Sequence, residues 1–333
     1  MNAHPITRPR ILSGMRPTGP LHIGHLFGAL ENWRQLQNDS DCYYMVADWH
    51  ALMSEYKDPS RIRQYTRENV ADWIACGIDP ERSTIFVQSD VPEHAELHLI
   101  LSTVTPVAWL ERCPTYKEQL QELAAKEINN YAFLGYPLLQ TCDILLYKAH
   151  LVPVGEDQLP HLELAREICR RFNSLYGAVF PEPQAKLTST PRILGIDNRK
   201  MSKSYGNFIA LSDEPDEIRR KVWGMFTDPQ RIRRTDPGRP EICNVHAYWQ
   251  LFDPQRAEQV AEQCRKAEIG CTDNKRELAE VIVARMEPIR RKRSEILADP
   301  AALDRLLARG AERARAFAAR TMHDVRRAIA FEE

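Results

Sequence analysis

RILSGMRPTGPLHIGH, residues 10–25, contains a short strand pattern, a turn rich in proline and glycine, and the start of a helix. RILSG predicts a strand, and PTGP predicts the turn that ends it. From Leu21 an apolar pattern at helical spacing continues to Leu36. In α/β sheets, ligands bind at such a corner, outside the carboxyl ends of the strands.

Strand-like and helix-like segments alternate beyond this turn. Apolar β-rich runs occur at 42–52, 84–88 and 144–155, and helical spacing occurs at 61–76 and 159–177. This alternation is typical of a parallel, doubly wound sheet with helices on its faces. We therefore predict an α/β fold with a Rossmann-like sheet.

The pattern changes near residue 210, where β-rich segments give way to helical ones. DEPDEIRRKVWGMF, PQRAEQVAEQCRKAE and the sequence from Lys275 onward all favour helices. A chain of 333 residues is too long for one ordinary core. We expect a Rossmann-like catalytic domain over residues 1–209 and a helical domain over residues 210–333.

Composition limits the class of protein. Charged residues make up 27% and hydrophobic residues 43%, which favours a folded chain over a disordered one. No apolar run reaches the roughly 20 residues that span a bilayer, and MNAHPITRPR lacks the apolar core of a secretion signal. Cys42, Cys76, Cys113, Cys142 and Cys169 lack the spacing of a disulfide framework, so we expect a cytoplasmic protein.

His22 and His25 lie three residues apart at the start of the first predicted helix. Residues at this spacing share a helix face, and a helix N-terminus attracts phosphate. Both rings can donate hydrogen bonds as charge builds on a leaving group. Gly24 leaves room for a flat adenine ring against the backbone. The alternative is a pair of surface histidines that cap a helix.

A second polar segment, NRKMSKSYGN, spans residues 198–207. Its Ser, Gly and Asn residues predict a loop. Lys200 and Lys203 can hold a pyrophosphate, because lysine is a mobile point charge. Taken alone, such a loop is more often a solvated basic turn.

Together the two segments, HIGH at 22–25 and KMSKS at 200–204, resemble the two motifs of class I aminoacyl-tRNA synthetases. The intervening segments YYMVADWHAL, VPEHAEL, WLERCPTYKEQ, GYPLLQTCDILLYKA and VPVGEDQLPHLELAREICRRFN resemble bacterial tryptophanyl-tRNA synthetases, of the type related to iron–sulfur-containing members. The similarity covers nearly the whole chain. It implies activation of L-tryptophan by ATP with Mg²⁺, followed by transfer of tryptophan to tRNA(Trp).

The resemblance also assigns residues to roles. Asp143 would accept a hydrogen bond from the indole N–H, which is only a donor. Tyr136 and Gln158 would hold the amino and carboxylate groups of tryptophan. His22, His25, Lys200 and Lys203 would be catalytic, through charge stabilisation of the phosphates. The ATP-binding residues implied are Arg16, Pro17, Thr18, Gly24, His25, Gly155, Glu156, Asp157, Ile193, Lys200, Met201, Ser202, Lys203 and Ser204.

The chain departs from its relatives at two of these positions. Many relatives carry glutamine at Arg16, and some carry methionine at Gln140, against the indole ring. No acidic cage for Mg²⁺ is visible in the sequence, which suits an ion held by phosphates and water.

The helical region carries a local excess of positive charge. Residues 285–327 contain twelve Lys or Arg and six Asp or Glu, although the whole chain has a net charge of −1. A basic helical face can follow an RNA backbone, and the resemblance implies an anticodon-binding domain. The alternative from the residues alone is a solvated face of ion pairs. The resemblance further implies a homodimer.

Cys243, Cys264 and Cys271 match three of the four cysteines that hold an iron–sulfur cluster in some members of the family. The fourth position is Asn274, a poor replacement for a thiolate. We therefore expect a relic of the site, without metal or cluster.

Two other functions are considered. A tyrosyl-tRNA synthetase-like enzyme would share both class motifs, but VADWHAL and GEDQLPHLEL favour tryptophan. A non-catalytic RNA-binding paralogue would show damage in one of the two motifs, and both are intact.

Overall fold

The computed structural model describes residues 8–122, 126–187, 193–199, 201 and 205–332. Within these ranges no helix is long and apolar enough to cross a membrane. Contacts between Cα atoms divide the chain into two compact units. Unit 1 comprises residues 1–18, 32–189 and 299–333, and unit 2 comprises residues 19–31 and 190–298.

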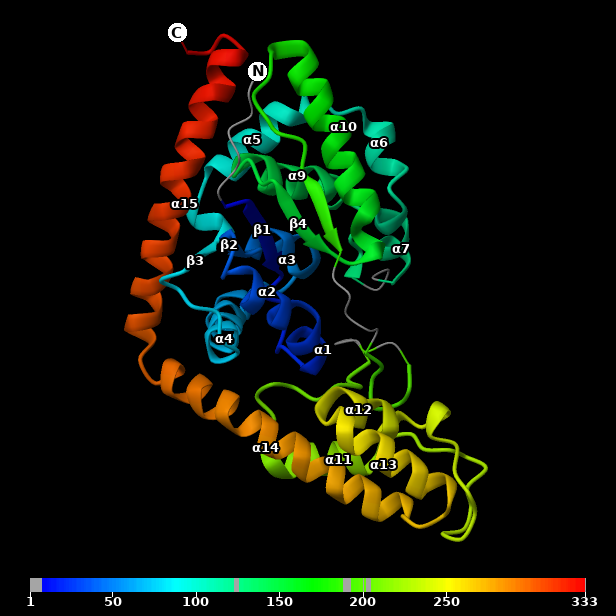
Figure 1. The fold of residues 1–333 in the computed structure, drawn as a ribbon. Helices are drawn as coiled ribbons and strands as arrows, with labels where there is room; N and C mark the ends of the chain where they lie inside the picture. Colours follow the sequence, from blue (N-terminus) through cyan, green and yellow to red (C-terminus); the bar gives the residue numbers. More distant parts are fainter. Residues whose placement is uncertain (1–7, 123–125, 188–192, 200, 202–204, 333) are drawn as a thin grey trace. The chain divides into compact units, whose positions relative to one another are not determined.

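Unit 1 is built on a five-stranded parallel sheet, in the order β3-β2-β1-β4-β5 (Figure 1). Its strands are β1 (Arg10–Met15), β2 (Asp41–Val46), β3 (Ser83–Val87), β4 (Leu151–Val154) and β5 (Gln184–Leu187). The strand order reverses at β1, because β2 and β3 lie on one side of it and β4 and β5 on the other. The Rossmann-like, doubly wound sheet predicted from the sequence is therefore confirmed.

Helices surround this sheet within unit 1. Helix α2 (Glu31–Leu36) begins at the boundary of unit 1. The helices of unit 1 that follow it are α3 (Asp48–Glu55), α4 (Ile62–Ala75), α5 (Glu93–Ser102), α6 (Val107–Glu111), α7 (Pro114–Glu122), α8 (Tyr131–Leu134), α9 (Tyr136–Leu146), α10 (Leu159–Tyr176) and α15 (Pro300–Ala328). Apolar residues of β2, β3 and β4 form one core with residues of α5, α9, α10 and α15. Short 3-10 turns occur at η2 (Gln88–Asp90) and η4 (Glu156–Gln158).

The segment 144–155, expected as one strand, was predicted wrongly. Residues 144–146 end α9, and only Leu151–Val154 forms β4. Helix α9 is buried on nearly every side, from Tyr136 to Leu146, with Gln140 the one half-buried residue. An apolar run of this kind has no period that separates a buried helix from a buried strand.

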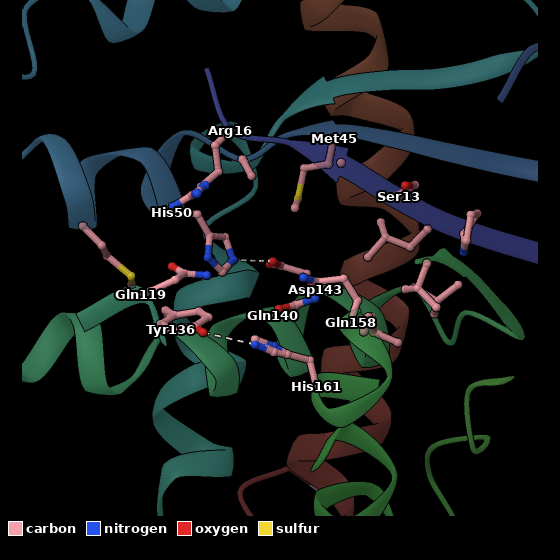
Figure 2. A pocket seen from close by; sticks show the side chains of 18 of the residues that line it. Ser13, Arg16, Met45, His50, Gln119, Tyr136, Gln140, Asp143, Gln158 and His161 are labelled. Carbon is pink, nitrogen blue, oxygen red and sulfur yellow. Dashed lines mark hydrogen bonds and ion pairs between the residues drawn. The ribbon is translucent and has the colours of Figure 1, made fainter. Parts of the chain in front are cut away.

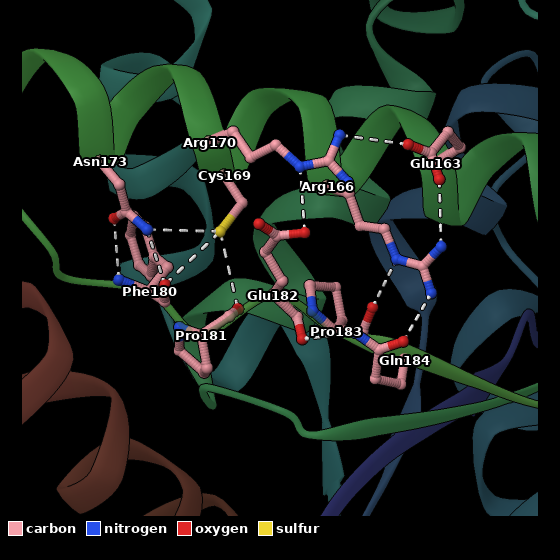
Figure 3. A network of polar contacts seen from close by, with 10 residues as sticks. All are labelled: Glu163, Arg166, Cys169, Arg170, Asn173, Phe180, Pro181, Glu182, Pro183 and Gln184. Carbon is pink, nitrogen blue, oxygen red and sulfur yellow. Dashed lines mark hydrogen bonds and ion pairs between the residues drawn. The ribbon is translucent and has the colours of Figure 1, made fainter. Parts of the chain in front are cut away.

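Helix α10 is attached to the segment that leads into β5 (Figure 3). Arg166 Nε donates to the Pro183 carbonyl at 2.8 Å, and Asn173 Nδ2 donates to the Phe180 carbonyl at 2.7 Å. Arg170 Nε pairs with Glu182 at 3.0 Å. These bonds satisfy polar groups of a segment that otherwise lacks regular structure. They hold β5 beside β4 at the edge of the sheet.

Helix α15 packs against the edge strand β3. At Gly310 the approach is so close that a Cβ atom would lie 1.7 Å from the Ile85 carbonyl oxygen, so only glycine fits. Arg326 forms a two-bonded ion pair with Glu96 of α5, at 2.7 and 2.5 Å. This helix was expected in a separate helical domain over 210–333, and instead it completes the core of the sheet unit.

Unit 2 is mainly helical. It includes two short helices from the N-terminal part of the chain, α1 (Ile23–His25) and a π-helix at Leu26–Leu30. Helix α2 begins at the boundary between the two units. Its other helices are α11 (Pro215–Trp223), η5 (Pro240–Ile242), α12 (Asn244–Phe252), α13 (Pro254–Arg265) and α14 (Cys271–Leu297). Helix α14 packs on α11 and α12, burying Ile218, Trp249 and Ile282.

Candidate functional site

A pocket of about 350 Å³ opens in unit 1, beside the carboxyl ends of β1 and β4 (Figure 2). These two strands lie where the strand order reverses, the position at which doubly wound sheets bind ligands. A volume of this size suits a small molecule. Gly14, Met45 and Val154 bring the strands to its wall, and helices α3, α7, α9 and α10 supply the polar side chains.

Asp143 lines this pocket and is held by three side chains. Its Oδ2 accepts from His50 Nε2 at 2.9 Å, and its Oδ1 accepts from His94 Nδ1 at 2.7 Å and from Gln88 Nε2 at 2.8 Å. The carboxyl group is almost completely buried. Burial acts to raise the pKa of Asp143, but the hydrogen bonds from His50 and His94 outweigh burial and hold the pKa below its usual range. The pocket therefore contains an ionised, buried acceptor.

Tyr136 lies in the same pocket, with its hydroxyl 3.1 Å from His161 Nε2. Thr115 Oγ1 lies 2.5 Å from the same nitrogen. Burial lowers the pKa of His161 to about 4, and burial raises the pKa of Tyr136. Both side chains are therefore uncharged near neutral pH. Tyr136 lies about two helical turns before Asp143 on α9. His161 lies on the neighbouring helix α10, and the two side chains form one polar wall of the pocket.

Gln158, Arg16 and Gln140 also line the pocket. Gln158 Nε2 lies 3.3 Å from the Asp157 carboxylate. The Gln140 side chain makes the wall more polar than a methionine would, as expected from the sequence. The segment Gly155–Asp157 connects β4 to Gln158, and a Cβ on Gly155 would lie 2.6 Å from Asp157 Oδ1. Glu156 and Asp157 are exposed.

His22 and His25 lie in unit 2, with ring centroids 3.9 Å apart. His22 Nδ1 accepts from the Gly24 backbone N–H at 3.1 Å, and His25 Nδ1 accepts from the His22 backbone N–H at 3.2 Å. A neutral imidazole has one donor and one acceptor nitrogen. In their neutral forms both rings therefore carry their proton on Nε2, which makes Nε2 a hydrogen-bond donor.

The two motifs meet within unit 2. A Cβ on Gly24 would lie 3.0 Å from Met201 Sδ and 2.9 Å from the His22 ring. Ile23 N donates to the Ile209 carbonyl at 3.1 Å, beside the bridge of His22 to Ala210. The chain that leaves the lysine loop is thus hydrogen-bonded to the first motif.

Several assigned residues lie outside the described part of the chain. These are Lys200, Ser202, Lys203 and Ser204 of the lysine loop. Ile193 is described and half-buried, in unit 2, while Pro17 and Thr18 end the first segment of unit 1.

The cysteine corner of unit 2 comprises Cys243, Cys264, Cys271 and Asn274, together with Arg231. Arg231 Nη1 lies 3.3 Å from Cys264 Sγ and 3.9 Å from Cys271 Sγ. Asn274 Oδ1 accepts from Trp249 Nε1 at 2.6 Å. Burial raises the pKa of the Cys243 and Cys264 thiols, whereas cluster ligands are thiolates. These residues do not fit a cluster, since the fourth position is already paired and a guanidinium lies against two of the thiols. Among the described residues no group of three or more His, Cys, Asp or Glu is arranged to hold a metal ion.

The basic residues of 285–327 are divided between α14, in unit 2, and α15, in unit 1. In α15, Arg313 and Arg315 donate to the carbonyls of Pro80 and Asp90, at 2.8 and 2.7 Å. Part of the positive charge of α15 therefore stabilises unit 1.

Sequence reasoning did not assign four residues of the pocket region. They are Gln88, His94, His50 and His161, which bond to Asp143 or to Tyr136. Three are histidines inside apolar segments, VADWHAL, VPEHAEL and LPHLEL. A histidine in a buried run needs a polar partner, and this was the available signal.

The chain is similar to known proteins over nearly its whole length. The model of the family "tRNA synthetases class I (W and Y)" matches residues 5–287. The tryptophan–tRNA ligase of Thermotoga maritima is 53% identical, over 96% of this chain and 98% of that protein. The tryptophan–tRNA ligase of Aquifex aeolicus is 42% identical, over 96% of this chain and 99% of that protein.

A solved structure also matches nearly the whole chain. The tryptophanyl-tRNA synthetase of Campylobacter jejuni, crystallised with ADP and tryptophan, superposes with a TM-score of 0.88 at 33% identity. The match covers 96% of this chain and 99% of that one.

Proposed function

Since the chain belongs to the tryptophan and tyrosine family of class I tRNA synthetases, we propose that it activates L-tryptophan with ATP and transfers it to tRNA(Trp). The observation that carries the proposal is the ionised, buried Asp143 in a pocket at the point where the strand order reverses. Indole N–H is only a donor, so this acceptor suits it. Relatives of 40% identity and more, named for tryptophan, favour this amino acid over tyrosine.

Tyr136 and Gln158, which line the same pocket, would bind the amino and carboxylate groups of tryptophan. The tryptophan carboxylate then attacks the α-phosphorus of ATP, forming tryptophanyl-AMP as pyrophosphate leaves. His22 and His25 would donate their Nε2–H groups to phosphate oxygens, as their backbone-bonded Nδ1 atoms require. Lys200 and Lys203 would neutralise the departing pyrophosphate. A ribose hydroxyl at the 3′ end of the tRNA next attacks the adenylate.

The remaining ATP contacts are assigned by motif match. They are proposed for Arg16, Pro17, Thr18, Gly24, Gly155, Glu156, Asp157, Ile193, Met201, Ser202 and Ser204. Mg²⁺ would be held mainly by phosphate oxygens and water and would reduce the negative charge of the phosphates.

The partners follow from the same proposal. The helical residues of unit 2, with basic α14 residues such as Arg291 and Lys292, would bind the anticodon arm of tRNA(Trp). We propose a cytoplasmic homodimer without an iron–sulfur cluster. A molar mass by light scattering that equals one chain at assay concentration would contradict the dimer.

The enzymatic proposal is tested by ATP–pyrophosphate exchange with tryptophan and tyrosine compared at equal concentrations. We expect exchange with tryptophan and little with tyrosine. Preference for tyrosine would indicate the tyrosine enzyme, and no exchange with either would indicate a non-catalytic paralogue.

A further inference from the structure

We propose that His94 is a positioning residue for amino-acid selection, which together with Tyr147 fixes the Asp143 carboxylate toward the indole N–H of tryptophan. The inference rests on the proposed function, in which Asp143 accepts that N–H. It extends the site beyond the pocket wall, since neither His94 nor Tyr147 is among the lining residues.

The geometry is a chain of three buried groups. Tyr147 Oη lies 2.8 Å from His94 Nε2, and His94 Nδ1 lies 2.7 Å from Asp143 Oδ1. His94 and Tyr147 are both inaccessible to solvent. They come from different helical segments, α5 and the end of α9, so the packing of these two helices sets the distance.

The direction of each hydrogen bond follows from Asp143. An ionised carboxylate only accepts, so His94 Nδ1 carries a proton and donates it to Oδ1. In the neutral ring Nε2 is then the acceptor, and the Tyr147 hydroxyl donates to it. Burial raises the pKa of Tyr147, which keeps this hydroxyl protonated. Tyr147 therefore selects the His94 tautomer that Asp143 needs.

The two oxygens of Asp143 have different surroundings. Oδ1 is held by His94 and Gln88, which lie behind the pocket wall, whereas Oδ2 is held by His50, which lines the pocket. A carboxylate has about four acceptor positions. Three are used by protein donors, and the remaining one is on Oδ2, the oxygen on the pocket side. Anchoring Oδ1 from behind thus aims Oδ2 at the ligand.

This arrangement makes a distinctive prediction about substrates. If His94 acts through Asp143, its loss harms only ligands that donate an N–H to Oδ2. An analogue of tryptophan with sulfur in place of the ring N–H, 3-(3-benzothienyl)alanine, has the same shape and no donor. The preference for tryptophan over this analogue therefore isolates the positioning role.

The experiment measures kcat/KM for tryptophan and for the sulfur analogue by ATP–pyrophosphate exchange in full-length variants. In His94→Leu we expect the preference for tryptophan to fall by about 10-fold, with the analogue changed by less than about 2-fold. His94→Asn keeps an N–H donor near the Nδ1 position and should retain most of the preference. Tyr147→Phe removes one oxygen only and should lower the preference by about 3-fold.

Equal losses for tryptophan and the analogue in His94→Leu and Tyr147→Phe would overturn the positioning role and indicate a general structural one. An unchanged preference in both would overturn it as well. Should His94→Leu fail to fold, Tyr147→Phe decides, because its ring still fills the same space. Failure of the proposed function has a different signature, since the wild-type enzyme itself would then show no preference for tryptophan over the analogue.

Discussion

The pocket around Asp143 and the cysteine corner around Asn274 are both buried polar clusters, yet their polar atoms face different partners. In the pocket, His50, Tyr136 and Gln158 converge on a cavity of about 350 Å³. In the corner, Asn274 is paired with Trp249, and Arg231 lies against the thiols. A buried polar group must be satisfied, either by a ligand or by its neighbours. The pocket leaves an acceptor position for a ligand, whereas in the corner Asn274 and Arg231 already have internal partners.

The largest effect should come from Asp143→Ala. The variant removes the acceptor of the indole N–H and also leaves the donors of His50, His94 and Gln88 without their partner. We expect tryptophan-dependent adenylate formation to fall by about 100-fold or more, since such a loss costs about 3 kcal/mol.

The measurement is kcat/KM for tryptophan, compared with ATP affinity by equilibrium binding. ATP affinity should change little. If Asp143→Ala activated tryptophan at the wild-type rate, the role proposed for Asp143 would be contradicted. Asp304→Ala, which removes a surface aspartate, serves as the control.

A second test uses the pH dependence of stability near the pocket. The pKa of His161 is lowered by burial to about 4, against about 6.5 in an unfolded chain. As pH falls from 6.5 toward 4, the unfolded chain binds a proton that the folded chain does not, so the stability contributed by the neutral ring is lost. When the pH is lowered from 7.5 to 5, we expect His161 to decrease the free energy of unfolding of the wild type by about 2 kcal/mol.

His161→Gln keeps a hydrogen-bonding side chain that does not titrate. Urea unfolding of wild type and variant at the two pH values gives the difference directly. The wild type should lose more stability than the variant on acidification, and parallel losses would contradict a buried neutral His161.

In the cysteine corner, Asn274→Ala should lower the free energy of unfolding without affecting tryptophan activation. It leaves the buried Trp249 N–H without an acceptor, a cost of about 1–3 kcal/mol. Chemical unfolding and the KM for tryptophan are the two measurements. A changed KM for tryptophan with an unchanged free energy of unfolding would contradict a purely structural role for Asn274.

The smallest effect is expected in the iron content of the purified protein. Anaerobically purified wild type should be colourless and near iron-free, because Asn274 is paired and Arg231 lies against Cys264 and Cys271. Asn274→Cys restores four cysteines, and combining it with Arg231→Ala should raise iron and sulfide uptake on reconstitution. Stoichiometric iron in the wild type, with the absorbance of a thiolate-bound cluster, would show that the corner still binds one.

The sequence was sufficient to predict the class of fold and the family. The doubly wound sheet and the family were predicted, and the structure places Asp143, Tyr136 and Gln158 in one pocket. The partners of Asp143 were not predicted, because His50 and His94 lie 93 and 49 residues away along the chain. Their meeting depends on how α3, α5 and α9 pack, which no local pattern encodes.

The same limit applies to the division of the chain. Residues 300–328 have a helical, basic pattern that resembles the rest of the C-terminal region. Whether such a helix packs on other helices or on a sheet depends on its apolar face. Here Gly310, Ala314 and Ala318 form a flat side that approaches the sheet unit closely. Small residues permit this approach, but they also occur in helices that pack elsewhere.

Helix α15 also bears on the order in which the chain is made. Synthesis runs from β1 onward, so the ribosome produces the five strands and all of unit 2 before it reaches residues 299–328. Until then the core residues that face Ala314, Ala318 and Met322 remain uncovered. Unit 2 therefore has its full set of residues while the sheet of unit 1 still waits for its last helix. During that interval the nascent sheet exposes apolar surface of the kind that chaperones bind.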